Sequence, residues 1–197
     1  ALVALGVGTW LLRNGGESRI DIVKRVLASW DMEDEDEVPF SYDDVDRWLA
    51  NFAPDATVLG MPITDPQVRE ITAAFDIWNE RIEVVAEPVE IFEGSVSVET
   101  RRTDDFHGAG GLVMYATQRS KFNEDNEIIE ESLRTHQFAD YKAFDTAYID
   151  WYEQEAYPGE TLVRDLGGLA WTPENAAISM ANLDAFLAFS DEYPIAP

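Results

Sequence analysis

Cysteine is absent from this chain of 197 residues, so neither a disulfide nor a thiolate metal site can form. Histidine is nearly absent: His107 and His136 are the two copies, which leaves little material for a histidine-based metal site or catalytic triad. We therefore expect no metal and no cofactor. Basic residues are also scarce, with 14 against 39 acidic residues, and the net charge is -25. Such a charge repels phosphate backbones, so the sequence predicts no nucleic-acid partner.

What the chain does have is apolar material in the proportion of a globular protein. Hydrophobic residues make up 46% of it and aromatic residues 12%. A disordered chain of this charge would have fewer of both. The length suits one sizeable domain with its own core, and leaves room for an appendage.

The first twelve residues form an apolar run without any charged residue. The run is shorter than the roughly 20 residues that a membrane-spanning helix needs. A flexible link, Arg13-Asn14-Gly15-Gly16, follows it. The run is either the remnant of an export signal or anchor, or a buried N-terminal helix. We favour the first, which predicts an N-terminal membrane tether and an extracytoplasmic or membrane-anchored location rather than a cytoplasmic one.

Helical spacing and capping residues predict three helices in the first half of the chain. Ser18 can cap a helix over 18–30, Ser41 can cap one over 41–52, and Asp65 followed by proline opens a third. Apolar residues recur in the third helix at spacings of three and four, which predicts packing against a sheet. They are Val68, Ile71, Phe75, Trp78 and Ile82.

Strand patterns dominate the middle of the chain. A short strand is expected at 56–59, then longer ones at 84–92, 95–106, 111–122 and 127–141, joined by hairpin-like turns. His107 lies in one of these turns and is expected in solvent. Two more helical patterns follow, over 141–157 and from Thr172 onward. Helices followed by an antiparallel meander predict an α+β fold, with three N-terminal helices on one face of a curved antiparallel sheet and extra C-terminal helices.

The strand at 95–106 carries the main candidate for a site. Alternate side chains of a strand share a face, so Val96, Val98, Thr100, Arg102 and Asp104 lie together. The two valines indicate that this face is inside. Buried charges need partners, so we expect Arg102 and Asp104 to contact each other or a shared ligand. The alternative is a plain salt bridge at the rim of the sheet.

The order of helices and strands resembles that of the NTF2-like superfamily, which includes SnoaL-like and ketosteroid-isomerase-like domains. The segments that carry the resemblance are 26–30, 48–58 and the closing 138–144. In that family a cone, formed by the curved sheet and three helices, encloses a pocket. The resemblance implies an NTF2-like domain over 18–144, after an apolar segment at 1–17 and before a helical extension at 145–197.

One subfamily can be compared residue by residue. The stretch Thr100-Arg101-Arg102-Thr103-Asp104 is similar to the Thr-x-Arg-x-Asp of limonene-epoxide-hydrolase-like proteins, in which the arginine and aspartate help to activate water and protonate the epoxide. Other positions depart from that pattern. Gly60 and Val58 stand where the subfamily has asparagine and tyrosine, and the second aspartate would fall on Thr135, His136 or Gln137.

Three functions remain open at this point. We favour a protein that binds a small apolar or carbonyl-containing molecule in the cone. Its pocket would be lined by Thr100, Tyr115, Thr135, Gln137 and Trp30. The alternative is an isomerase, cyclase or epoxide-hydrolase-like enzyme that uses Asp104 and Arg102, with Tyr115 or His136 polarising a carbonyl. The third is a structural module that forms a homodimer.

Overall fold

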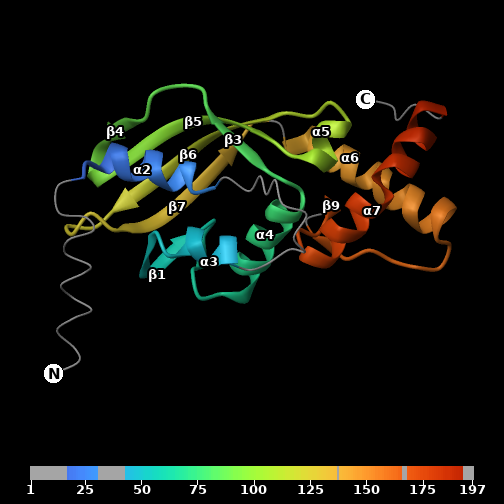
Figure 1. The fold of residues 1–197 in the computed structure, drawn as a ribbon, viewed down its shortest axis with the longest axis horizontal. Coiled ribbons are helices and arrows are strands. Elements are labelled where there is room, and N and C mark those ends of the chain that lie inside the picture. The colour runs from blue at the N-terminus through green and yellow to red at the C-terminus, as the bar shows by residue number, and fades with distance from the viewer. Residues whose placement is uncertain (1–16, 31–42, 137, 166–167, 193–197) are drawn as a thin grey trace.

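The computed structural model describes residues 17–30, 43–136, 138–165 and 168–192. Figure 1 shows a curved sheet at one end of an elongated molecule and the C-terminal helices at the other. The described part contains six α-helices and a mixed sheet of seven strands. The predicted α+β fold class is therefore confirmed, and the architecture is consistent with a cone of the NTF2-like kind.

Capping residues start two of the helices where the sequence predicted. Ser18 accepts a hydrogen bond from the backbone N–H of Asp21 at 3.2 Å, and Asp65 accepts one from Gln67 at 2.9 Å. Such caps satisfy amide groups that have no partner inside the helix. The helices are α2 (Arg19–Ala28), α3 (Asp43–Leu49), α4 (Pro66–Ile77), α5 (Asp105–Ala109), α6 (Phe138–Trp151), which continues as a π-helix, η2 (Tyr152–Ala156), and α7 (Pro173–Glu192).

The main sheet has the order β2-β1-β7-β6-β5-β3, and β4 also pairs with β5. Its pairs are antiparallel except that of β1 with β7, which is parallel, so the sheet is mixed rather than antiparallel throughout. The strands are β1 (Phe52–Val58), β2 (Met61–Pro62), β3 (Arg81–Val84), β4 (Val89–Ile91), β5 (Ser95–Thr103), β6 (Met114–Phe122) and β7 (Ile128–Thr135); a 3₁₀ turn, η1 (Phe92–Gly94), precedes β5, and β8 (Arg164–Asp165) with β9 (Gly168–Leu169) forms a separate small sheet.

Two predicted elements have boundaries that differ from those expected, and the observed strand contains or borders a proline in each case. The helix expected over 41–52 ends at Leu49, and Phe52 already begins β1. The pairing of β1 with β7 is irregular between Phe52 and Thr57, so Pro54 lies where the ladder is interrupted. Of the strand expected over 84–92, Val84 is the last residue of β3, which begins at Arg81, and Val89–Ile91 form β4. Pro88, which has no N–H to donate, precedes β4. Ser41, the expected cap of the second helix, lies outside the described residues.

The strand expected over 95–106 ends at Thr103, because Asp104 caps a short helix instead. Its carboxylate accepts a hydrogen bond from the backbone N–H of His107 at 2.7 Å, which starts α5. The hairpin turn predicted at 107–110 is thus replaced largely by a helix. Aspartate is a strong N-cap residue, and this local hydrogen bond competes with continuation of the strand.

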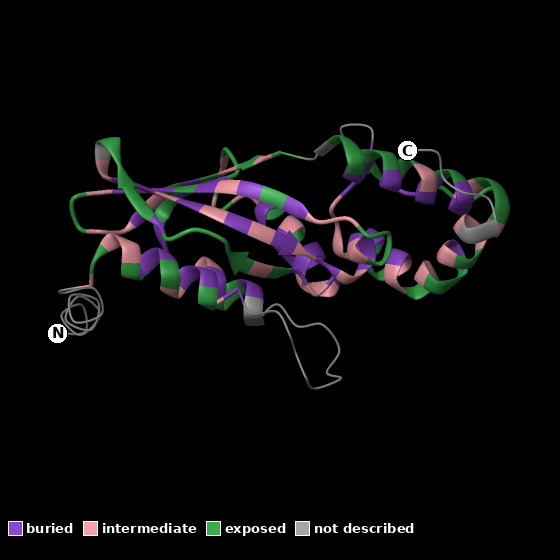
Figure 2. Cartoon of the chain, turned by 90° about the horizontal axis from the view of Figure 1, so that it is seen from above, coloured by how far each residue is buried: buried purple, intermediate pink, exposed green. Residues whose placement is uncertain are grey.

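The predicted alternation of β5 is confirmed. Val96, Val98, Thr100 and Arg102 are buried, and the residues between them are partly exposed. The neighbouring strand β6 alternates in the same way, as the change of colour along the strands in Figure 2 illustrates. The buried side of the sheet is called the inner face below. It is covered by α2, α3 and α4, which supply residues to the same core.

Trp78, at the end of α4, joins this core to the C-terminal helix. Its ring is fully buried and stacks on Phe106 with 5.8 Å between centroids. Its Nε1 donates a hydrogen bond to the hydroxyl of Ser179 in α7 at 2.9 Å. Residues on both sides of position 144 therefore share one core, and the division into 18–144 and 145–197 stays a prediction. None of the described helices is long and apolar enough to span a membrane.

Replacing Trp78 by alanine should lower the free energy of unfolding by about 3–5 kcal/mol, through lost burial and the cavity left behind. Urea unfolding followed by circular dichroism measures this loss. Phe92 is the matched control, because it is a large aromatic residue that is 89% exposed. Its replacement by alanine should change the free energy of unfolding by less than about 0.5 kcal/mol. Equal losses for the two variants would mean that Trp78 is not a core residue.

Candidate functional site

A cavity of about 190 Å³ lies between the inner face of the sheet and the helices that cover it. Strands β5, β6 and β7 form one wall, and residues of α2, α3 and α4 form the opposite one. Most of the lining is apolar. Its apolar residues are Leu27, Trp30, Trp48, Val58, Leu59, Met61, Val68, Ile71, Phe75, Ile82, Leu133 and Trp171. The cavity is therefore a small hydrophobic chamber built on the predicted strand face.

One part of the lining is polar and comes from three adjacent strands. Arg102 of β5, Gln118 of β6 and Glu131 of β7 all border the cavity and are all buried. The guanidinium of Arg102 donates to Gln118 Oε1 at 2.8 Å and to both carboxylate oxygens of Glu80 at 3.2 Å. It also lies 5.9 Å from the centre of the Trp30 ring. Arg102, Gln118 and Glu131 are called the polar end of the cavity below.

Glu131 is the carboxyl that the polar end contributes to the lining of the cavity. Burial raises the pKa of its carboxyl to about 7, and the attraction of Arg102 offsets this effect only in part. Its Oε2 has no hydrogen-bond partner among the described residues. Burial also raises the pKa of Glu80, although Arg102 opposes the shift. A carboxyl that titrates near neutral pH inside an apolar chamber is suited to proton transfer.

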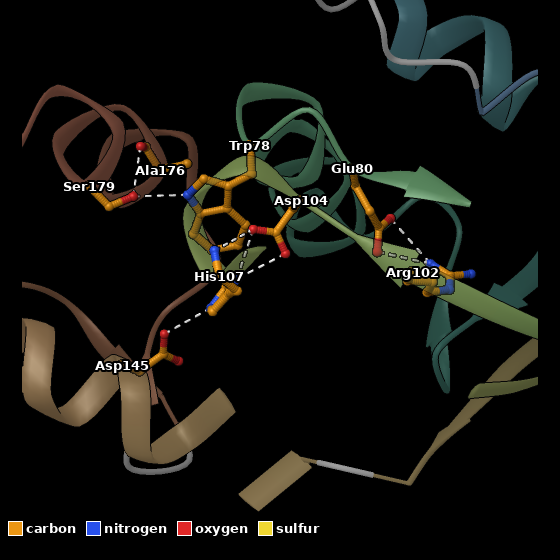
Figure 3. Close-up of polar contacts among 8 residues, drawn as sticks. All are labelled: Trp78, Glu80, Arg102, Asp104, His107, Asp145, Ala176 and Ser179. Carbon is orange, nitrogen blue, oxygen red and sulfur yellow. Dashed lines mark hydrogen bonds and ion pairs between the residues drawn. The ribbon is translucent and has the colours of Figure 1, made fainter. Parts of the chain in front are cut away.

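The expected contact between Arg102 and Asp104 is not the one that forms. Both side chains are buried, as predicted, but Arg102 pairs with Glu80 and Asp104 pairs with His107 (Figure 3). Asp104 does not border the cavity. The separation arises because Asp104 follows the last residue of β5 and its carboxylate is used as the cap of α5.

His107 was expected in solvent, and this expectation is wrong. The imidazole is 2% exposed and lies between two carboxylates: Nδ1 is 3.0 Å from Asp104 Oδ2, and Nε2 is 3.1 Å from Asp145 Oδ1. Burial lowers the pKa of His107, but the two carboxylates outweigh it and raise the pKa to about 9. The ring is then an imidazolium at neutral pH, and both of its nitrogens donate.

Asp145 extends this arrangement to the C-terminal segment. Its second oxygen accepts a hydrogen bond from the backbone N–H of Leu169 in β9 at 3.3 Å. Asp104, His107 and Asp145 thus connect the end of β5, helix α6 and strand β9, and they are called the His107 cluster below. No group of residues in the described part of the chain is arranged to hold a metal ion.

The residues predicted to line a pocket are placed differently from one another. Trp30 and Thr135 border the cavity. Thr100 is fully buried on the inner face, and its hydroxyl donates to the carbonyl of Ala116 at 3.2 Å, but it does not border the cavity. Tyr115 is 44% exposed, since its position in β6 directs it to the outer face, which corrects the expected inward orientation. Gln137 lies outside the described residues.

The alternation of β7 accounts for His136 as well. Leu133 and Thr135 border the cavity, so the neighbouring His136 is directed away from it and is exposed. Its ring contacts Thr117 on the outer face, with 3.4 Å between Nε2 and Oγ1. This position separates His136 from any ligand in the cavity. The catalytic roles considered for Asp104 and Arg102 stay predictions.

Three residues of the site were not found from the sequence: Glu80, Gln118 and Glu131. A signal existed for Glu131, because it precedes Leu133 and Thr135 on the same face of β7. The same holds for Gln118, which lies on the same buried face of β6 as Ala116 and Phe122. Glu80 had no such signal, because it lies between a helix and a strand and reaches Arg102 across 22 positions of the chain.

The chain matches no protein-family model and no curated protein. Solved structures with a similar course of the chain include a protein of unknown function with a cystatin-like fold from Methylobium petroleophilum PM1. They also include AclR of Streptomyces galilaeus, named provisionally as a hydroxylase. Each is 12% identical to this chain, with a TM-score of 0.43 and 60% of this chain covered. The matches cover 76% and 78% of those two chains, respectively. At these values neither likeness assigns the chain to a family.

The His107 cluster predicts a stability that falls with rising pH. The pKa of His107 in the folded state, about 9, lies above its ordinary value of 6.5. Between pH 6.5 and 9 the folded state therefore keeps a proton that the unfolded chain has lost. The stabilisation is complete below pH 6.5 and is lost as the pH rises through 9. Urea unfolding at a series of pH values should show a loss on the order of 3 kcal/mol across this window.

Two variants separate this effect from that of Glu131, whose raised pKa lowers stability in the adjacent window between 4.5 and about 7. His107→Gln should be less stable at pH 7 and should lose the decline between pH 6.5 and 9. Glu131→Gln should keep that decline and reduce the one at lower pH, to which the raised pKa of Glu80 also contributes. An unchanged decline in His107→Gln would assign the high-pH window to another group.

Proposed function

We propose that this chain is an NTF2-like protein whose cavity binds a small, mostly apolar molecule that carries one carbonyl-type polar group. The observation that supports the proposal is the composition of the cavity, with apolar walls and a single polar end. Sites for small molecules commonly have this composition. The apolar area supplies most of the affinity, and a few polar groups fix the orientation.

The size of the cavity limits the part of a ligand that it can hold. An apolar protein cavity of about 150 Å³ is already enough to bind benzene. The cavity here, at about 190 Å³, therefore suits one ring with a short substituent. Trp30, Trp48 and Phe75 on the helical side offer aromatic surface to such a ring.

An unpartnered hydrogen-bond donor favours a carbonyl group on the ligand. Nε of Arg102 is buried and has no acceptor among the described residues. A buried polar group without a partner is costly, and a ligand that supplies the partner removes the cost. A carbonyl oxygen is the acceptor that an otherwise apolar ligand can bring.

Two probes of nearly equal shape test the proposal: acetophenone, which has a carbonyl, and ethylbenzene, which has none. Both should bind, and acetophenone should bind about fivefold tighter, because one net hydrogen bond contributes about 1 kcal/mol. Calorimetric or NMR titration measures both dissociation constants. Failure of both probes to bind at their solubility limit would overturn the proposal.

A pair of variants shows whether the probes occupy the cavity. Leu133→Trp fills the cavity from β7 and should abolish binding. Ser132→Trp adds the same side chain at the next position, which is exposed, and should leave binding unchanged. An equal loss of probe binding in the two variants would mean that the probes bind outside the cavity. Unfolding curves of both variants check that Leu133→Trp is still folded.

Proton transfer on the bound carbonyl compound is a second candidate function, and the environment of Glu131 favours it. The Glu131 carboxylate would take a proton from the carbon next to the carbonyl. The C–H electron pair would become the double bond of an enolate, and Arg102 would stabilise the negative oxygen. Where the ligand has a C=C bond conjugated with the enolate, return of the proton to the far carbon of that dienolate would complete an isomerisation, and no further reactant is needed.

Deuterium exchange into the methyl group of acetophenone tests this step. The rate should rise as the pH increases through about 7, because the carboxylate form of Glu131 is the base. Glu131→Gln should lower the rate to that of buffer. Glu130→Gln changes the neighbouring, exposed residue and should have no effect. If the protein binds acetophenone but exchange never exceeds the buffer rate, it is a binding protein for this class of compound and no proton-transfer enzyme.

A further inference from the structure

A second pocket, of about 340 Å³, adjoins the cavity. It is called the outer pocket below. Its lining comes from the β1–β2 turn, α4, α6 and the segment between β8 and α7. The outer pocket and the cavity have four lining residues in common. These are Leu59, Met61, Ile71 and Trp171. All four are apolar, so the boundary between the two spaces is a hydrophobic partition.

The polar lining of the outer pocket differs from that of the cavity. Glu70 and Asp165 contribute exposed carboxylates, and Lys142 is the one basic residue among the described residues that line it. Asp145 also borders the pocket, but its oxygens are used by His107 and by the backbone of Leu169. The lining of the pocket therefore includes two exposed carboxylates and the aromatic ring of Trp171.

Tyr141 also lines the outer pocket, and its side chain is 3% exposed. Carboxylates and an aromatic ring around one space are the groups that bind ammonium ions. The net charge of -25 also raises the local concentration of cations around the protein.

We propose that the cavity and the outer pocket form one binding site for an elongated ligand that ends in a basic amine. The apolar ring lies in the cavity, a short hydrocarbon chain crosses the partition, and the ammonium group lies in the outer pocket near Glu70, Asp165 and Trp171. This inference rests on the proposed function, because it assumes that the cavity holds the ring.

Three probes distinguish the parts of this site. Ethylbenzene reaches only the cavity. 4-Phenylbutylamine and 4-phenylbutan-1-ol are long enough to cross the partition, and they differ in the charge of the terminal group. At pH 7 and low ionic strength the amine should bind about fivefold tighter than the alcohol, as expected for two exposed carboxylates with an aromatic neighbour. Added salt should reduce this ratio.

Matched double variants assign the preference to the outer pocket. Glu70→Gln with Asp165→Asn should bring the ratio of the two dissociation constants close to one and leave ethylbenzene binding unchanged. Glu124→Gln with Asp125→Asn removes the same number and kind of charges from the exposed β6–β7 turn, and should keep the ratio of the unmodified protein.

The outcomes separate this inference from the proposed function. If ethylbenzene binds but the amine has no advantage over the alcohol, the outer pocket is not an ammonium subsite. An equal reduction of the ratio in both double variants would mean that the preference comes from the overall charge of the protein, and this too would overturn the inference. If none of the three probes binds, the proposed function is wrong, and this inference, which rests on it, is wrong as well.

Discussion

Arg102 places a guanidinium on the inner face of the sheet, where its side chain is almost completely withdrawn from water. A charge in that position is unstable without a counter-charge, so the surrounding elements must supply one. Glu80, which precedes β3, provides it, and Gln118 of β6 accepts a further hydrogen bond. This requirement places β3, β5 and β6 in one polar arrangement at the wall of an otherwise apolar cavity.

The same requirement accounts for the properties of Glu131. One guanidinium faces two buried carboxyls, and the direct bonds of Arg102 go to Glu80 and not to Glu131. Burial raises the pKa of Glu131 to about 7, because the attraction of Arg102 offsets the cost of burial only in part. Glu131 borders the cavity, so this raised pKa belongs to a group on the cavity wall. Uncompensated groups of this kind are more common at functional sites than in ordinary cores.

The His107 cluster has the opposite character. Its imidazolium has a carboxylate at each nitrogen, and Asp145 also receives a backbone N–H. These side chains satisfy one another and face no part of the cavity. Their effect is to hold α5, α6 and β9 together, with Trp78 and Ser179 making a second connection to α7. The C-terminal segment is thereby fixed where it forms one wall of the outer pocket.

The sequence by itself determined the fold class, two helix caps and the inner face of β5, because these depend on local chemistry and on periods of 3.6 and 2 residues. It also indicated that Arg102 and Asp104 would be buried. Only the tertiary structure decided their partners. Glu80 and Asp145 reach the site from elements distant in the chain, so no spacing predicts their contacts with Arg102 and His107. The pKa of Glu131 was likewise undetermined, since it depends on burial by helices and on how Arg102 divides its bonds. Local sequence patterns indicate which side chains point inward. The packing of elements that are distant in the chain decides which of these side chains contact each other.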